Sequence, residues 1–275
     1  AVAPRPWTTL PASIERALAA CTTSLLCISN EDGEYDGRAA FVAAAMAARA
    51  RHVHMVGTSR RAFLASMTAS SARVFALARD VRMAMRPTSR VSARSASGTR
   101  LDIEMAPHLR WFTNGDAVRP GQWINVPFGA VVASPHQVNG VYVADAAVGG
   151  GPGARAGLLA DKPIRLTFEN GRLRGVEARD LALKRYVEAF AASGPNRDRV
   201  GLVSVGANLG ILTPLGEIIH DENLPGLHVA LGETFPGQSG ATWTAHGQLA
   251  FAAASSDVDV DGVPLVRHAR FVRFV

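Results

Sequence analysis

Cysteine is nearly absent from this chain of 275 residues, which has only Cys21 and Cys27. Two cysteines cannot supply a four-thiolate zinc site, and they are too few to cross-link a domain of this size. Both lie in the apolar run CTTSLLCISN, so we interpret them as buried thiols of a cytoplasmic protein. The low cysteine content argues against a disulfide-rich scaffold.

Long apolar runs and lysine are scarce as well. No segment approaches the roughly eighteen uninterrupted apolar residues of a membrane-spanning helix, and the first residues lack the apolar core of a secretory signal. We therefore predict no membrane partner. Of the 29 basic residues only Lys162 and Lys184 are lysines, and the formal net charge is +6. This positive charge favours acidic partners.

Arginine is concentrated in one stretch before and after Pro87. Its members have helical spacing up to that proline, and we interpret the stretch as a solvated face. Base-reading motifs and stacking aromatics are absent, so we predict no nucleic-acid partner. The alternative is a surface for an acidic peptide or cofactor. The stretch consists of Arg79, Arg82, Arg86, Arg90 and Arg94.

The hydrophobic pattern changes near residue 90. Before it, strand-like and helix-like segments alternate, which predicts a small lobe with parallel strands. After it, apolar and polar residues alternate between Asn-Gly and Asp-Gly turns, as in antiparallel hairpins; the segment 122–135 is counted among these strands. One helix is predicted at 180–193, and the glycine-rich segment 149–157 is predicted to be a flexible loop. We predict an α+β fold with an N-terminal α/β lobe, residues 1–90, and a β-rich domain, residues 91–275.

Three residues in the last third of the chain are candidate metal ligands. Glu222 is followed six residues later by His228 in an apolar, strand-like run, and His246 lies in a turn-like segment. Two imidazoles and one carboxylate resemble the ligand set of catalytic zinc or non-haem iron. Each residue also has an ordinary interpretation, as a turn carboxylate, a core histidine and an exposed histidine respectively. His220 and Asp221 are weaker alternative ligands.

Several segments, in order, resemble the aminopeptidase T family of metallopeptidases, whose relatives include a 2,5-dihydroxypyridine dioxygenase. The resemblance implies an aminopeptidase T-like β-rich domain, a groove between the lobes, a homodimer and a metal centre. The segment 222–232 is the most specific of those that match. The matching segments are residues 98–101, 125–130, 202–208, 222–232, 246–248 and 261–262.

The departures from the family's motifs lie where its chemistry is expected. Ala130 and Leu202 replace two glutamates, and Gln248 replaces the aspartate of an H-x-D motif. Phe235 falls near the position of an active-site tyrosine. A pair of catalytic metal ions needs several bridging carboxylates. The matching residues Glu222, His228 and His246 can therefore hold one ion at most.

We predict a non-catalytic peptide-binding protein derived from a metallopeptidase, with no catalytic residue and no cofactor. The role we consider for it is recognition of a precursor or leader peptide in a bacterial peptide biosynthetic pathway. The arginine excess favours an acidic peptide, and an extended peptide can bind by adding a strand to a sheet edge. The alternative is a mononuclear hydrolase of aminopeptidase type or a non-haem iron dioxygenase, with one Zn or Fe ion held by Glu222, His228 and His246. A structural subunit that pairs with an active paralogue is a third possibility.

Overall fold

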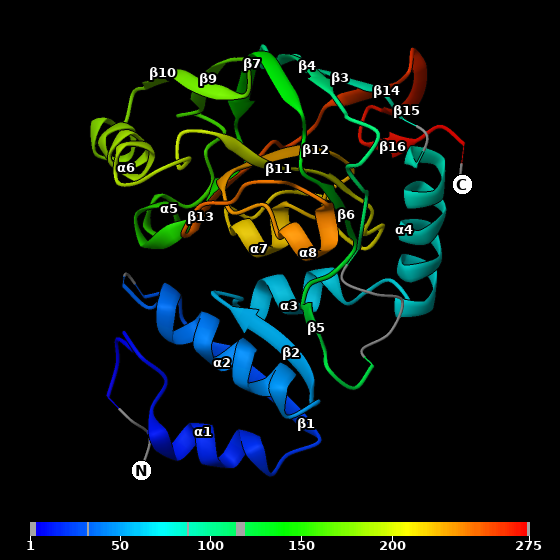
Figure 1. The fold of residues 1–275 in the computed structure, drawn as a ribbon. Coiled ribbons are helices and arrows are strands. Elements are labelled where there is room, and N and C mark those ends of the chain that lie inside the picture. Colours follow the sequence, from blue (N-terminus) through cyan, green and yellow to red (C-terminus); the bar gives the residue numbers. More distant parts are fainter. Residues whose placement is uncertain (1–3, 32, 87, 114–118, 274–275) are drawn as a thin grey trace.

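Two lobes make up the molecule, a smaller one below and a larger β-rich one above (Figure 1). The computed structural model describes residues 4–31, 33–86, 88–113 and 119–273. Helices and strands are both abundant, so the predicted α+β class is confirmed. No helix in these ranges is long and apolar enough to cross a membrane.

The lower lobe is built on a three-stranded sheet in the order β1-β2-β5. Both pairings, of β2 with β1 and of β2 with β5, are parallel. The alanine-rich helix α2 packs on β2, and Phe41 and Ala45 of this helix are buried against Leu26 of β1. The elements of the lower lobe are α1 (Ala12–Ala19), β1 (Thr23–Ile28), α2 (Tyr35–Ala47), β2 (Arg51–Val56), α3 (Arg60–Ser66) and β5 (Gln122–Asn125). Helix α4 (Ser71–Met85) follows α3 and contributes Leu77, Val81 and Met85 to the main core of the upper lobe.

The strand β5 corrects the prediction made for its segment. Residues 122–125 were expected among the antiparallel strands of the second domain, but β5 pairs in parallel with β2. The alternation in this short segment is the same in either setting, and its partner lies about seventy residues earlier in the chain. The change of pattern near residue 90 coincides with the passage from α4 to the upper lobe, and the chain then returns to the lower lobe at β5.

Two sheets form the upper lobe. The first has eight strands in the order β10-β9-β7-β4-β3-β14-β15-β16, and all pairings between its described strands are antiparallel, as the turn signals predict. Its strands are β3 (Arg90–Arg94), β4 (Arg100–Glu104), β7 (Gln137–Ala144), β9 (Ile164–Glu169), β10 (Arg172–Ala178), β14 (Asp257–Val260), β15 (Val263–Arg267) and β16 (Arg270–Phe271).

The second sheet of the upper lobe has five strands in the order β6-β11-β12-β13-β8. Its central strand β12 is buried along its whole length. The strands are β6 (Ala130–Ala133), β8 (Ala147–Val148), β11 (Val200–Gly206), β12 (Gly226–Gly232) and β13 (Gln248–Ala252), and the helices of this lobe are α5 (Gly150–Ala156), α6 (Leu181–Ala192), α7 (Ile218–Asp221) and α8 (Pro236–Ser239).

The main core lies between these two sheets, and the side chain of Tyr142 connects them across it. Tyr142 of β7 is fully buried, and its hydroxyl lies 3.2 Å from the carbonyl oxygen of Leu227 and 3.1 Å from that of Phe251. These carbonyls belong to β12 and β13 of the other sheet, so the tyrosine side chain crosses the core and contacts both layers.

Two of the helices test the local predictions. The predicted helix 180–193 is confirmed as α6, whose first turn is capped by the Asp180 carboxylate through the amides of Ala182 and Leu183. The predicted loop 149–157 is wrong, because residues 150–156 form α5. Its glycines permit close packing: a Cβ on Gly153 would lie 2.0 Å from the carbonyl oxygen of Val148.

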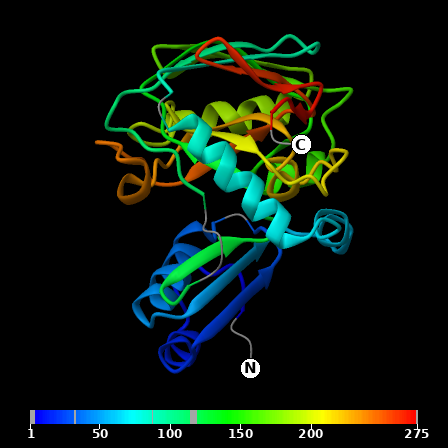
Figure 2. The same cartoon turned by 90° about the vertical axis from the view of Figure 1, so that its right-hand side faces the viewer.

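Helix α4 carries the first part of the arginine stretch and runs beside both lobes (Figure 2). Its buried side includes Val74, Leu77 and Val81. Among the stretch predicted as a solvated face, Arg82 is half-buried and the other members are exposed: Arg79, Arg86, Arg90 and Arg94. Pro87 lies outside the described residues. The prediction of buried thiols is wrong, since Cys27 is exposed and Cys21 is half-buried.

Candidate functional site

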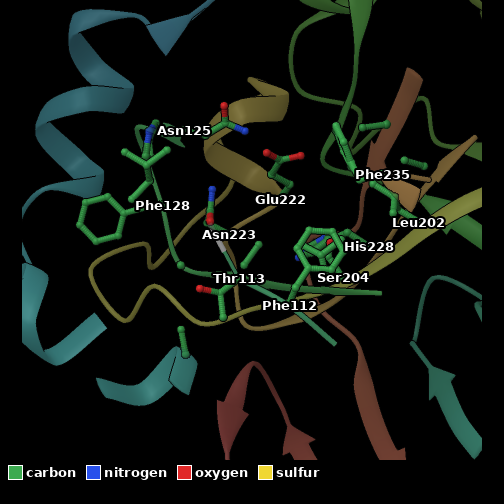
Figure 3. A pocket seen from close by; sticks show the side chains of 18 of the residues that line it. Phe112, Thr113, Asn125, Phe128, Leu202, Ser204, Glu222, Asn223, His228 and Phe235 are labelled. Atoms are coloured by element: carbon green, nitrogen blue, oxygen red, sulfur yellow. The ribbon is translucent and has the colours of Figure 1, made fainter. Parts of the chain in front are cut away.

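A cavity of about 120 Å³ lies where β5 and α4 meet the five-stranded sheet (Figure 3). Most of its wall is apolar and aromatic, with a few polar side chains between. The aromatic residues that line it are Phe75, Phe112, Trp123, Phe128, Phe235 and Phe251. The polar residues are Thr113, Asn125, Ser204, Glu222, Asn223, His228 and Gln248.

The aromatic side chains contact one another around the cavity. Phe75 of α4 stacks on Phe128 with ring centroids 4.6 Å apart. Phe235 lies 6.4 Å from Phe112 and 6.4 Å from Trp123, measured between ring centroids. Such contacts between large side chains fix the shape of the wall, so this part of the cavity is bounded by packed apolar surfaces.

Three neighbouring strands of the five-stranded sheet form another wall. Their register places Ser204 beside His228, and it aligns Leu202, Ala230 and Ala250 in one row. Because side chains alternate along a strand, positions 202, 204, 228, 230, 248 and 250 share one face. The departures from the family's motifs, Ala130, Leu202 and Gln248, all line the cavity. These positions, which the resemblance singled out, thus lie together at the cavity, and two of them, Ala130 and Leu202, have no atom that could bind a metal ion.

His228 is buried, and both of its ring nitrogens have backbone partners. The amide of Ala253 donates to Nδ1 at 3.3 Å, so Nδ1 is unprotonated. Nε2 then carries the hydrogen and donates to the carbonyl oxygen of Leu224 at 2.8 Å. Burial is the largest cause that lowers the pKa of His228, which favours this neutral form. The lone pair that a metal ion would need is used by an amide.

Glu222 brings a carboxyl group into the same cavity. The residue is half-buried by surface area, but burial of its side chain raises the pKa of Glu222 to about 7. Among the described residues, the structure gives this carboxyl no hydrogen-bond or ion-pair partner. Asn125 also lines the cavity, and its buried Oδ1 has no hydrogen-bond partner within the same ranges. Figure 3 shows Asn125, Glu222 and Asn223 beside one another.

His246 does not line the cavity with Glu222 and His228. Its side chain is 63% exposed, and its Nε2 lies 2.9 Å from Oδ1 of Asp36 at the start of α2. Its ring also contacts Tyr35 edge-on at 5.2 Å. The structure thus places two of the three predicted ligands together, while the third links the two lobes at another point of their interface.

The weaker alternatives, His220 and Asp221, form a buried pair of their own. Nδ1 of His220 lies 2.7 Å from Oδ1 of Asp221. The same carboxylate accepts hydrogen bonds from the amides of Leu215 and Gly216. This set of bonds fixes the loop before α7, so Asp221 has a structural role.

The donor set does not fit a metal ion of the predicted kind. Within the described parts of the chain, no group of three or more His, Cys, Asp or Glu side chains is arranged to hold a metal ion. A catalytic zinc or iron site needs three such ligands. The cavity offers only Glu222 and His228, and His228 would first have to give up the amide of Ala253.

Metal loading is therefore expected to fail at this site. After incubation with Zn and with Fe(II) and removal of free ions, elemental analysis should find clearly less than one ion per chain. The substitution His228→Ala should leave that amount unchanged, because the imidazole has no lone pair available. A stoichiometric ion that disappears in this variant would contradict the assignment of His228 as a hydrogen-bonded core residue.

Sequence reasoning missed several residues of the cavity. Trp123 lies two residues before the segment 125–130 that the resemblance singled out, so its place near the site could have been predicted from the sequence. Phe75 and Phe112 have no such signal, because one lies on a helix and the other in an irregular segment. Their proximity to the site depends on how the two lobes meet.

No protein-family profile matches the chain, and no curated protein sequence does. Among solved structures, the protein is similar to 2,5-dihydroxypyridine dioxygenase from Pseudomonas putida KT2440, with a TM-score of 0.67 and 14% sequence identity. The match covers 99% of this chain and 80% of that chain. At this identity the likeness shows a shared fold alone. The resemblance to the aminopeptidase T family has no support in these comparisons.

Proposed function

We propose that this protein binds peptides without metal chemistry, through the cavity around Glu222. The observation that carries the proposal is the carboxyl of Glu222, which lies in an aromatic cavity without a protein partner. A polar group in such a place calls for an explanation, because buried polar groups are normally hydrogen-bonded. A ligand that donates a hydrogen bond would supply the missing partner.

The chemistry of Glu222 favours an amine or amide of the ligand. A carboxyl with a pKa of about 7 is partly ionised near neutral pH, and an ammonium group at close range would favour its ionised form. Asn125 Oδ1 is an acceptor without a partner among the described residues and can take a second hydrogen from the ligand. A free peptide N-terminus provides several N–H donors at one point.

The aromatic wall would hold the side chain that follows that amine. A cavity of about 120 Å³ bounded by Phe112, Trp123 and Phe235 suits an apolar side chain better than a whole peptide. Strand addition is restricted next to the cavity, because Val132 of the edge strand β6 already pairs with Phe112. We therefore propose insertion of one residue, with the rest of the peptide outside the cavity. A precursor or leader peptide fits this mode.

A mononuclear metalloenzyme is the second candidate. The similarity of fold to a dioxygenase favours it, and the donor set of the cavity does not. Loading with Zn and Fe(II), described above, separates the two candidates.

The proposal is tested with short peptides whose first residue is Phe, Leu or Ala and whose N-terminus is either free or acetylated. Calorimetry should show tighter binding of the free amine, with apolar first residues preferred. Loss of a charge-assisted hydrogen bond weakens binding by about tenfold or more, so Glu222→Gln should reduce the affinity for the free peptides by that factor. The acetylated peptides should be affected less.

The exposed Glu177 of β10 provides a matched control. The variant Glu177→Gln loses the same charge far from the cavity and should bind as the parent protein does. If all peptides fail to bind at millimolar concentrations, or if Glu222→Gln and Glu177→Gln behave alike, the proposed function is wrong.

A further inference from the structure

Arg38 of α2 is a half-buried arginine with an incompletely satisfied guanidinium. Its Nε is buried and has no hydrogen-bond partner among the described residues. The carboxylate of Glu34 does not neutralise it fully, because Glu34 is bound by Arg5 and by the amide of Trp7. Asp36 pairs with His246. Both carboxylates that closely precede Arg38 in the sequence, Glu34 and Asp36, thus have other partners.

Two histidines of β2 form a hydrogen-bonded chain in the same lobe. Oγ of Ser24 lies 2.9 Å from Nδ1 of His52, and Nε2 of His52 lies 3.3 Å from Nδ1 of His54. Burial lowers the pKa of His52 to about 4 and that of His54 to about 3, so both rings are neutral at physiological pH. When the Ser24 hydroxyl donates to Nδ1 of His52, Nε2 of His52 carries a hydrogen and donates it to Nδ1 of His54. Nε2 of His54 then also carries a hydrogen and is able to act as a donor.

The hydrogen-bonded histidines His52 and His54 lie beside the cavity. The register of the parallel pair places His52 opposite Trp123 and His54 opposite Asn125, so the four side chains share one face of the sheet. The ring of His54 contacts Trp123 edge-on at 5.9 Å between centroids. Both Trp123 and Asn125 line the cavity. Helix α2 packs on β2 and also contacts β5, and the charge of Arg38 on this helix is one of the causes that lower the pKa of His54, after burial and the charge of His52.

We propose that Arg38 and His54 form a carboxylate-binding subsite next to the Glu222 cavity. A guanidinium has a planar fork of N–H donors that matches a carboxylate, and a neutral imidazole adds one further donor. The proposal rests on the proposed function in one respect, since it assumes that part of the same ligand occupies the cavity. The ligand would then carry a carboxylate near the group inserted against Trp123.

A carboxylate can come from a small aromatic acid, from a peptide C-terminus or from an acidic side chain. The first probe is therefore 3-phenylpropionate, with 3-phenylpropionamide as its uncharged counterpart. Binding is followed by NMR on the Arg38 Nε–H and Trp123 indole signals, each assigned by substitution. The acid should shift both signals and bind about tenfold or more tightly than the amide, as expected for a hydrogen bond between ions.

Variants of Arg38 decide whether this preference belongs to the subsite. Arg38→Gln should reduce the affinity for the acid to that for the amide, whereas Arg51→Gln, at an exposed position of β2, should keep the preference. Arg38→Lys retains the positive charge but lacks the planar guanidinium, so it should keep only part of the preference for the acid. This variant replaces Arg38→Gln in the test if Arg38→Gln does not fold. Equal affinities for acid and amide, or equal effects of Arg38→Gln and Arg51→Gln, would overturn the proposal.

Peptides form the second arm of the experiment and separate the sources of the carboxylate. Each peptide is compared with its C-terminal amide and with a variant that has Gln in place of Glu. A preference for one acidic form that is lost in Arg38→Gln identifies the source and supports both proposals. If 3-phenylpropionate binds through Arg38 and no peptide binds, the subsite stands and the peptide function fails. If peptides bind through Glu222 without any preference for a carboxylate, the subsite fails alone.

Discussion

Replacing Glu222 with Gln is expected to stabilise the protein above neutral pH and to change its stability little in weak acid. The pKa of Glu222 is raised by burial from 4.5 to about 7 in the folded state. A carboxyl with a raised pKa contributes stability below its unfolded pKa, and this contribution is lost as the pH rises through the folded value. Allowing for the residue's partial exposure, we expect the variant to gain about 1–2 kcal/mol at about pH 8.

The measurement is the free energy of unfolding in urea at several pH values, for the parent protein and the variant. The difference between them should appear between about pH 5 and pH 8 and should level off outside that window. The Glu177→Gln variant controls for the general effect of removing one negative charge. A difference that does not depend on pH would show that the Glu222 carboxyl is well solvated in the folded protein. It would then weaken the proposal that this carboxyl needs a ligand as its hydrogen-bond partner.

Tyr142→Ala is expected to have the largest effect on stability of the changes considered. The side chain is fully buried between the two sheets of the upper lobe, and its hydroxyl contacts the carbonyls of Leu227 and Phe251. Removing a large buried side chain leaves a cavity and typically costs about 3–5 kcal/mol. The loss should appear as a lower urea midpoint with little change in the slope of the transition.

Tyr142→Phe separates packing from hydrogen bonding at this position. It keeps the ring and removes only the hydroxyl, so we expect it to cost about 1 kcal/mol. Equal losses in the two variants would show that the hydroxyl, and not the packed ring, holds the sheets together. Ser204, His228 and Ala230 line the cavity from the face of the five-stranded sheet that points away from the core around Tyr142. Ligand binding by Tyr142→Phe therefore provides a check that the site itself is intact.

The sequence predicted the α+β class and the helix α6 because their signals are local. Alternating apolar residues with Asn-Gly and Asp-Gly turns identify antiparallel strands, and an Asp at position 180 followed by an amphipathic run identifies a helix. The segment around Glu222 and His228 was predicted to carry a site, and both residues line the cavity. In each case the residues that decide the structure are neighbours in the chain.

The remaining features depend on contacts that the sequence does not display. The strand β5 has its partner in β2, and α5 forms because glycines allow it to approach β8 closely. The spacing of Glu222, His228 and His246 suggested one metal site, but the turn that carries His246 directs it toward Asp36. Arg38 and His54 gave no sequence signal, since the burial of both and the missing partner of Arg38 Nε depend on how α2 packs on the sheet of the lower lobe.

The return of the chain to the lower lobe at β5 has a consequence for synthesis on the ribosome. The sheet β1-β2-β5 cannot be completed until residue 125 has left the exit tunnel, by which time β3 and β4 of the upper lobe have already emerged. Pairing across so many residues carries a cost in chain entropy and slows folding. We therefore expect a nascent chain that is stalled near residue 90 to remain sensitive to proteases, and protection to appear only after β5 is released.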